Sequence, residues 1–372
     1  MDKKIKIALI FGTRPEAIKM CPLVRQLKKN HNFDIKTIVS AQHRQMLDSV
    51  LELFEIKPDY DLNLMKPNQN LWNLSSDILL GIKNVLDKEK PDLVLVHGDT
   101  TTAGMSALSA FYSRIKIGHV EAGLRTFDKD YPFPEEINRV IVDSVSDLMF
   151  CPTDKSINNL RNSNITNGVY KTGNTVIDAL LYVVENKSAD LDFIGLNPNL
   201  KTILLTSHRR ENFGEPIKNI CNAIKELIEK HKDIQIVYPM HLNPNVRNTV
   251  IPILGNIDRI KLIEPLDYVP FCTLMKKSHI ILTDSGGVQE EAPALGVPVL
   301  VLRDETERPE AVESGSVRLA GTNKDKIIKE VELLLNDNQH YNNMAKAINP
   351  YGDGKACIYI EKIIEDYFKV SS

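Results

Sequence analysis

Three acidic residues stand where a parallel sheet would bring them together. Asp99 and Glu121 each stand just past the end of a short apolar, β-branched run, and they come two residues after His97 and His119. Glu135 stands at a predicted helix start that follows a proline-rich turn. Ligands of open α/β sheets bind beyond the carboxyl ends of the strands, where converging carboxylates can accept and donate protons. The spacing predicts an acid–base site, although each acid taken singly could also be a helix cap or a loop ion pair.

The two histidine–carboxylate pairs also permit a metal site as an alternative. Alternate residues of a strand share a face, so His97 and Asp99 would point to the same side. Such pairs are common in sequences, however, and no third spacing such as HExxH accompanies them. We therefore predict no metal, and buried, hydrogen-bonded side chains for His97 and His119.

Cations and glycines at two other strand-to-helix junctions suit a diphosphate. Gly12-Thr13-Arg14-Pro15-Glu16 follows the first apolar run, and Lys19 comes about one helical turn later. Pro15 fits the first turn of a helix, whose free N–H groups attract anions. Ser285-Gly286-Gly287 can form a nest of backbone amides before another helix. Glu291 could then accept ribose hydroxyls, and Arg308 could reach the same phosphates.

One further residue and two absent motifs narrow the chemistry. His208 follows a strand of the second half and is a candidate acid or base, because the pKa of histidine lies near neutrality. The sequence contains neither GxGxxG nor GxxxxGK[ST], which argues against a tightly held dinucleotide and against a P-loop NTPase. We predict an enzyme without a cofactor that acts on a nucleotide-diphosphate sugar held between two domains.

The elements that position these residues occur as two similar series. Apolar strands alternate with stretches of helical period such as Leu71–Leu86 and Ile217–His231, which indicates parallel sheets covered on both faces. The predicted strands are Ile5–Phe11, Ile35–Val39, Leu93–Val96, Ile115–Val120, Leu148–Cys151, Ile203–Thr206, Ile234–Tyr238, Ile260–Ile263, Ile280–Thr283 and Val299–Leu302. A length of 372 residues also exceeds the usual single-domain range. The fold class is therefore α/β, with two doubly wound domains.

The domain boundaries follow from turn-rich segments. We predict an N-terminal domain over 1–185 with the acid–base residues, and a C-terminal domain over 186–353 with the diphosphate site. The loose segment 186–200, which contains a glycine, a proline and several asparagines, marks the join. A helix over 354–372 follows a strong turn signal and is expected to pack back on the N-terminal domain.

Composition excludes several classes of protein. The 46 Lys and Arg residues nearly balance the 49 Asp and Glu residues, and the net charge of −3 argues against a nucleic-acid partner. No apolar run reaches the roughly 18–20 residues that a membrane span needs, and no secretory signal follows Met1. The five cysteines are odd in number and lack CxxC spacing, so disulfides and zinc knuckles are not expected. We expect a cytoplasmic enzyme with no membrane partner.

Long strings along nearly the whole chain carry a family resemblance. They include FGTRPEAIKM (11–20), HGDTTTA (97–103), GHVEAGLRT (118–126), PFPEEINR (132–139), TGNTVIDAL (172–180), SHRREN (207–212) and LTDSGGVQEEAPALG (282–296). In these strings the chain resembles the non-hydrolysing UDP-N-acetylglucosamine 2-epimerases. The resemblance implies two Rossmann-like domains facing across a cleft in the glycosyltransferase-B arrangement, and a homodimer. It also implies reversible conversion of UDP-GlcNAc to UDP-ManNAc, which supplies ManNAc units for cell-surface polysaccharide.

The resemblance also implies roles for individual residues. Those that look like the UDP-binding set are Arg14, Lys19, Leu266, Phe271, Ser285, Gly286, Gly287, Glu291 and Arg308, with the apolar pair at the uracil. Those that resemble the catalytic group are Asp99, Glu121, Glu135 and His208. We expect the carboxylates to exchange the proton at C2 and His208 to stabilise the departing phosphate.

Some bacterial relatives carry a second UDP-GlcNAc site that activates the enzyme. The residues that match its ligands are Gln42, Gln45, Arg209 and His241, with Glu135 shared between the two sites. Asn68 departs from the pattern, because those relatives carry an arginine there. The substitution removes a cation from a site for an anion.

The chemistry implied by the resemblance fits the residues. The C2 proton of this sugar is weakly acidic because no carbonyl adjoins it, and oxidation at C3 would need a nicotinamide, whose fingerprint is absent. Elimination of UDP to 2-acetamidoglucal, followed by re-addition, needs an anchored diphosphate and two acid–base groups. The alternatives are a hydrolysing epimerase that releases ManNAc and UDP, a glycosyltransferase of the same fold, a metal-dependent hydrolase and a noncatalytic nucleotide-sugar sensor.

Overall fold

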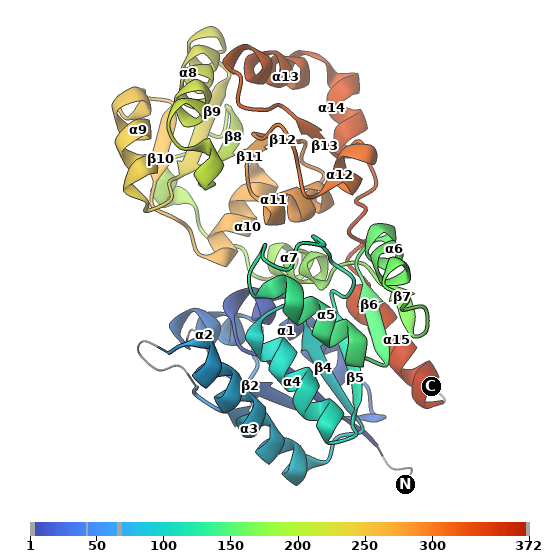
Figure 1. Ribbon diagram of the computed structural model, residues 1–372. Helices are drawn as coiled ribbons and strands as arrows, with labels where there is room; N and C mark the ends of the chain where they lie inside the picture. Colours follow the sequence, from blue (N-terminus) through green and yellow to red (C-terminus); the bar gives the residue numbers. More distant parts are fainter. Residues whose placement is uncertain (1–3, 42–43, 65–68, 370–372) are drawn as a thin grey trace. The chain divides into compact units, whose positions relative to one another are not determined.

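The computed structural model describes residues 4–41, 44–64 and 69–369, and it divides into two compact units (Figure 1). The first unit comprises Met1–Ala179 and Tyr351–Ser372, and the second comprises Leu180–Pro350. The chain thus passes between the units inside helix α7 (Thr175–Asn186) and again after Pro350, whereas the sequence placed the domain boundaries after residues 185 and 353.

The first unit contains a parallel sheet with strand order β3-β2-β1-β4-β5-β6-β7. Its strands are β1 (Ile5–Phe11), β2 (Phe33–Val39), β3 (Tyr60–Asp61), β4 (Leu93–His97), β5 (Lys116–Val120), β6 (Leu148–Cys151) and β7 (Val169–Lys171). In the centre of the sheet Ile10 pairs with Ile38 on one side and with Val96 on the other. Both faces of these strands are buried, which is why they read as continuous apolar runs.

Helices cover the first sheet. They are α1 (Arg14–Lys28), α2 (Arg44–Leu53), α3 (Leu71–Glu89), α4 (Thr101–Tyr112), α5 (Glu135–Val145), α6 (Asp154–Asn162), the start of α7, and α15 (Ala356–Phe368). The C-terminal helix α15, red in Figure 1, packs against α1. Glu361 of α15 accepts hydrogen bonds from Gln26 at 2.6 Å and from Asn30 at 2.7 Å, so the two ends of the chain are held in one unit.

The second unit repeats the design. Its parallel sheet has the order β10-β9-β8-β11-β12-β13. The strands are β8 (Lys201–Thr206), β9 (Ile234–Pro239), β10 (Ile260–Ile263), β11 (Ile280–Thr283), β12 (Val299–Val301) and β13 (Val317–Leu319). The α-helices after α7 are α8 (Glu215–Lys230), α9 (Pro244–Leu254), α10 (Tyr268–Lys277), α11 (Gly286–Glu291), α12 (Pro309–Glu313), α13 (Lys324–Asn336) and α14 (Asn338–Ala345). Short 3₁₀ turns are η1 (Asp192–Ile194), η2 (Arg210–Asn212) and η3 (Ala292–Leu295).

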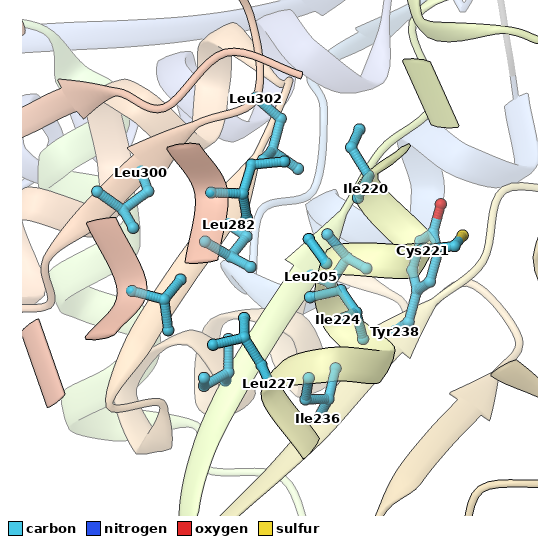
Figure 2. Close-up of a cluster of buried hydrophobic side chains, with 14 of the residues drawn as sticks. Leu205, Ile220, Cys221, Ile224, Leu227, Ile236, Tyr238, Leu282, Leu300 and Leu302 are labelled. Carbon is cyan, nitrogen blue, oxygen red and sulfur yellow. The ribbon is translucent and has the colours of Figure 1, made fainter. Parts of the chain in front are cut away.

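An apolar stripe on α8 forms one side of the core of the second unit (Figure 2). Ile220, Ile224 and Leu227 recur at helical spacing and are buried, so they form one face of the helix. They belong to the same cluster as Leu205 of β8 and Ile236 of β9. Burial of each such side chain contributes about 1.5–3 kcal/mol, so this stripe holds α8 on the sheet and fixes the loop that leads into it.

The fold-class prediction is confirmed, because both units are parallel α/β sheets with Rossmann-like strand order. All ten predicted strands are present. The strands that the sequence did not indicate are β3, β7 and β13. They are two or three residues long and lie at sheet edges, where a strand has too few buried residues to give an apolar run.

None of the helices that the structure describes combines the length and the apolar character of a membrane span.

The core of the second unit yields a first prediction. We expect Ile224→Ala to lower the free energy of unfolding of this unit by about 2–5 kcal/mol, because the substitution leaves a cavity under α8. Chemical denaturation followed by circular dichroism measures this loss. Ile348→Ala is the matched control, because Ile348 is 84% exposed and its truncation should change the free energy of unfolding by no more than about 0.5 kcal/mol. Equal losses in the two variants would contradict the packing described here.

Candidate active site

The switch point of the first sheet, where strand order reverses between β1 and β4, carries a hydrogen-bonded turn. The side chain of Thr13 caps α1 by accepting a hydrogen bond from the backbone N–H of Glu16. The Glu16 carboxylate in turn accepts a hydrogen bond from the backbone N–H of Thr13 at 2.8 Å. Glu16 also accepts from the Gly12 N–H at 3.0 Å and from the Thr100 hydroxyl at 2.7 Å. A side chain at Gly12 would collide with the Ser40 hydroxyl, so only glycine fits this turn. The starts of α1 and α4 are thereby fixed to each other.

Glu121 lies at the centre of a buried polar cluster in this unit. It follows β5 with a left-handed backbone conformation, at a φ of 66°. Its Oε1 lies 2.5 Å from Nζ of Lys19 and accepts a hydrogen bond of 2.8 Å from Nδ2 of Asn174. Its Oε2 lies 3.1 Å from Nε2 of His97. Residues from three separate parts of the chain therefore converge on one carboxylate.

The charges around Glu121 decide its protonation state. Burial by itself raises the pKa of Glu121, but the ammonium of Lys19 and the imidazole of His97 outweigh that effect. Together they hold the pKa of Glu121 well below its ordinary value. The side chain is 9% exposed and yet ionised near neutral pH, so it can accept a proton from a bound substrate.

Asp99 is held by a second ion-pair chain. Its Oδ2 accepts from Nε of Arg139 at 3.0 Å and from Nη2 at 2.6 Å, and its backbone carbonyl accepts from Asn138 at 2.9 Å. The same arginine reaches Glu136 at 2.9 Å. Asp99 remains partly exposed, with 27% of its side chain accessible, so the arginine orients the carboxylate without removing it from solvent.

Glu136 ties this chain to the loop before α5. It accepts hydrogen bonds from the backbone N–H groups of Thr126 and Phe127, both at 3.0 Å. Glu135 is the next residue back along the chain, at the first position of α5, and it is partly buried. The structure thus brings two of the predicted acids, Asp99 and Glu121, to the carboxyl edge of the first sheet and places Glu135 at the start of the neighbouring helix.

His119 belongs to a separate, structural network. Its Nδ1 lies 2.6 Å from Asp143 and its Nε2 lies 2.8 Å from the carbonyl of Gly98. Asp143 also pairs with Arg125 at 2.6 Å, and all of these side chains are buried. The prediction of a buried, hydrogen-bonded histidine is confirmed at this position. Among the residues that the structure describes, no three His, Cys, Asp or Glu side chains are grouped so that they could hold a metal ion.

A buried aspartate organises the switch point of the second sheet, between β8 and β11. Oδ2 of Asp284 accepts from the backbone N–H groups of His208 at 2.8 Å and Arg209 at 3.0 Å. It also accepts from the side chains of Ser207 at 3.0 Å and Asn212 at 2.9 Å. Burial raises the pKa of Asp284, but the imidazole of His208 and these donors lower it below its ordinary value. The carboxylate therefore shapes the whole β8–η2 loop.

The same aspartate orients the ring of His208. Nδ1 of His208 lies 3.3 Å from Oδ1 of Asp284, and the side chain is 43% exposed. The ring stacks on that of His241, with 5.7 Å between centroids and 19° between planes. Because Nδ1 faces the carboxylate, Nε2 is the nitrogen that can reach a substrate.

The predicted anion nest lies beside a cation of this loop. Ser285 precedes α11, and its N–H donates to the Thr283 hydroxyl at 3.0 Å. A Cβ built on Gly286 would lie 3.7 Å from Nη2 of Arg209, which places that guanidinium next to the glycines. Arg209 also pairs with Glu307 at 3.2 Å. The glycine turn and a positive charge thus occupy the same edge of the second sheet.

The other predicted UDP ligands occupy separate elements of the second unit. Glu291 ends α11, and Arg308, just before α12, makes a hydrogen-bonded ion pair with Glu290. Leu266 lies in the β10–α10 loop and Phe271 lies in α10, and both are partly buried.

Comparison with known proteins identifies the family. A family model described as UDP-N-acetylglucosamine 2-epimerase matches residues 25–365. The chain is similar to the UDP-N-acetylglucosamine 2-epimerase of Campylobacter jejuni, with 53% identity over 376 residues that cover 98% of this chain and 97% of that protein. This chain belongs to the UDP-N-acetylglucosamine 2-epimerase family. The resemblance found in the sequence is confirmed.

Solved structures of this epimerase family agree with the fold. A Listeria monocytogenes protein assigned as a UDP-N-acetylglucosamine 2-epimerase matches with a TM-score of 0.94 and 48% identity, over 99% of this chain and 98% of that chain. The UDP-GlcNAc 2-epimerase of Neisseria meningitidis, solved bound to UDP-GlcNAc, matches with a TM-score of 0.85 and 49% identity, over 98% of this chain and 100% of that chain.

Some features of this epimerase family member were not foreseen. From the sequence, Lys19 is assigned to the UDP-binding set, and in the structure its ammonium contacts Glu121. His97 is buried, as predicted, but the sequence did not indicate that its Nε2 faces Glu121. Asn174 was not singled out, although it stands in the string TGNTVIDAL (172–180) that supported the resemblance. Arg139, in PFPEEINR (132–139), was likewise not named.

The predicted second site is described only in part. Gln42 and Asn68 lie outside the described residues, and Gln45 lies in α2 with a side chain that is not among those described. Arg209 and His241 lie beside the glycine turn and His208, as given above.

The Asp284 network yields a prediction about pH. Because the pKa of Asp284 is lowered on folding, its ionised form stabilises the protein above the ordinary aspartate value of about 3.9, and that stability is lost as the pH falls through the folded value. We expect Asp284→Asn to reduce the free energy of unfolding by about 1.5–3 kcal/mol at pH 7, with a smaller loss near pH 3. Urea unfolding at the two pH values measures the difference. Asp258→Asn, at an exposed position of the same unit, is the control, and a loss that did not depend on pH would contradict the assignment.

Proposed function

We propose that this protein interconverts UDP-N-acetylglucosamine and UDP-N-acetylmannosamine by reversible epimerisation at C2, without net hydrolysis. The observation that carries the proposal is the ionised, buried Glu121 at the carboxyl edge of the first sheet, in a chain of this epimerase family. Further support comes from the Neisseria meningitidis relative, which was solved bound to UDP-GlcNAc.

The proposed reaction is an elimination followed by an addition. A base removes the C2 proton, the C1–O bond breaks, and its electron pair leaves with the β-phosphate oxygen of UDP. A C1–C2 double bond forms, which gives 2-acetamidoglucal. UDP then adds back to C1 while an acid delivers a proton to the opposite face of C2. Atoms and charges balance with no oxidant or reductant, so the route needs no redox cofactor.

We assign the proton transfers at C2 to the carboxylates of the first unit. Two groups are needed because the proton leaves one face of C2 and arrives on the other. Glu121 is available as a proton acceptor because Lys19 and His97 keep it in its ionised form. Asp99 is suited because Arg139 orients it while leaving it partly exposed. Glu135, at the start of α5, completes the proposed catalytic group with His208.

We assign stabilisation of the leaving diphosphate to the second unit and to the start of α1. Backbone amides of the Ser285–Gly287 turn and the charge of Arg209 beside it favour an anion. His208, with Nδ1 on Asp284, can present Nε2 to the departing phosphate. Arg14 is the first residue of α1, and its guanidinium adds a positive charge at that end of the helix.

We also propose that the enzyme works as a homodimer and that its product supplies ManNAc units for cell-surface polysaccharide. Exposed apolar side chains on α3 and α4 support a second copy as partner: Leu80, Phe111 and Tyr112 are 56%, 53% and 68% exposed. A groove of about 800 Å³ lies between these helices, and Leu80 and Tyr112 line it.

The cytoplasmic location and the second UDP-GlcNAc site remain predictions from the sequence.

Incubation with UDP-GlcNAc in deuterium oxide, without added cofactor or metal, tests the function. We expect UDP-ManNAc to form, with deuterium at C2 of both epimers by NMR, because each turnover takes the new C2 proton from solvent. Glu121→Gln should lower this exchange by about 10²–10⁴-fold and leave UDP binding intact. Free ManNAc and UDP as the main products would instead indicate a hydrolysing epimerase, and unlabelled substrate would reject the reaction altogether.

Arg14→Ala is the matched contrast for that experiment. It should weaken UDP binding, measured by calorimetry, because it removes a charge from the α1 start without touching Glu121. An unchanged dissociation constant would remove Arg14 from the substrate site. Loss of exchange in Arg14→Ala with unweakened binding would show that the two sets of residues had been assigned the wrong roles.

A further inference from the structure

Asn174 has each of its polar groups committed within the first unit. Nδ2 donates to Oε1 of Glu121 at 2.8 Å, and Oδ1 accepts from the backbone N–H of Val176 at 3.0 Å, which caps α7. Asn174 is buried, with 3% of its surface exposed. An N–H group faces Oδ1 and a carboxylate faces Nδ2, so only this orientation of the amide satisfies both neighbours.

The backbone of Asn174 is fixed by the returning C-terminal segment. Its N–H donates to the carbonyl of Tyr351 at 2.7 Å, and Tyr351 is buried. Asn174 and Tyr351 lie close in sequence to the two points where the chain passes from one compact unit to the other. The residue that contacts Glu121 is therefore held by a segment that is 177 positions away along the chain (351 − 174).

Two glycines allow this contact. A Cβ on Gly173 would lie 3.1 Å from both Cα of Gly352 and the carbonyl oxygen of Tyr351. A Cβ on Gly352 would lie 3.3 Å from Cα of Gly173 and 3.6 Å from the Asn174 nitrogen. Both glycines also have positive φ, 84° and 128°, which side chains disfavour. The two segments can approach closely only because neither position carries a side chain.

We propose that Asn174 is a positioning residue for Glu121, and that the Tyr351–Gly352 segment holds Asn174 where it can do so. This inference rests on the proposed function, in which the Glu121 carboxylate exchanges a proton at C2. Asn174 adds a neutral donor to Oε1, beside the charge of Lys19 from α1, while His97 from the end of β4 faces Oε2. The donor fixes the direction in which the carboxylate points and favours its ionised form.

Asn174→Asp separates this role from helix capping. Aspartate has the same shape and is also a good N-cap, so the bond to Val176 and the start of α7 are retained. It replaces the donor at Oε1 by a second carboxylate, which raises the pKa of Glu121. We expect kcat for epimerisation to fall about tenfold to hundredfold, with little change in KM or in UDP affinity. The acidic limb of the kcat–pH profile should move to higher pH.

A second readout does not depend on turnover. In protein labelled with ¹³C at glutamate side chains, the Glu121 resonance, assigned by its loss in Glu121→Gln, should titrate at higher pH in Asn174→Asp than in the wild type. If the wild-type protein failed to epimerise the substrate, the proposed function would be rejected. The titration of Glu121 would still test whether Asn174 influences this carboxylate. Unchanged titration, or unchanged kcat with an unmoved pH profile, would overturn the inference.

Asn30→Ala is the matched asparagine control. Its amide also donates to carboxylates, Glu361 and Glu365, both at 2.7 Å, but beyond the opposite end of α1. It should lower stability without moving the pH profile. A shift of the profile in this variant equal to that in Asn174→Asp would show that the effect is general and would reject the positioning role.

Gly352→Ala tests the returning segment. We expect it to lower kcat and to move the acidic limb in the same direction as Asn174→Asp, because the new methyl group would press on Cα of Gly173, the residue before Asn174, at 3.3 Å, and because a φ of 128° disfavours a side chain. Gly195→Ala is the control, because Gly195 also has a positive φ, 67°, but has no atom within 4 Å of a built Cβ. A folded Gly352→Ala enzyme with wild-type kcat and pH profile would show that Asn174 needs no support from this segment.

Discussion

The site depends on a carboxylate that stays ionised after it has been buried. Removal of a charge from water costs several kcal/mol unless opposite charges and hydrogen bonds replace the lost hydration. Each unit meets this constraint at the carboxyl edge of its sheet, with Glu121 in the first and Asp284 in the second. Much of the local structure can be understood as the set of partners that these two carboxylates require.

The two carboxylates meet the constraint in different ways, and the difference matches their proposed roles. Asp284 is satisfied on one oxygen by neutral donors of its own unit, including the backbone of His208 and Arg209, so it acts as a fixed anchor for a loop. Glu121 pairs with the ammonium of Lys19 from α1 and faces the imidazole of His97 from the end of β4, so its partners come from separate elements of the first unit. A carboxylate balanced in that way stays ionised while keeping the capacity to react.

The fold and much of the site could be predicted from the sequence because the signals were local. A buried parallel strand is an apolar run, and the residue that follows it lies at the carboxyl edge of the sheet. This logic located Asp99 and Glu121 and the glycine turn at Ser285. It failed for β7, because an edge strand of three residues buries too little to leave a pattern. It also treated His97 and His119 alike. The two histidines differ only in their tertiary contacts, which the sequence does not show: His97 faces Glu121, whereas His119 contacts Asp143.

By itself, the sequence determined the α/β class, the two parallel sheets, the family and the strand ends at which polar residues gather, because each depends on periodicity or on contiguous strings. Only the tertiary structure decided which partners those residues have. Lys19 and Asn174 reach Glu121 from positions 102 and 53 residues away, and Tyr351 supports Asn174 from farther still. No local pattern in the sequence indicates such contacts, because they form only when the strands assemble into a sheet and the end of the chain returns to the first unit.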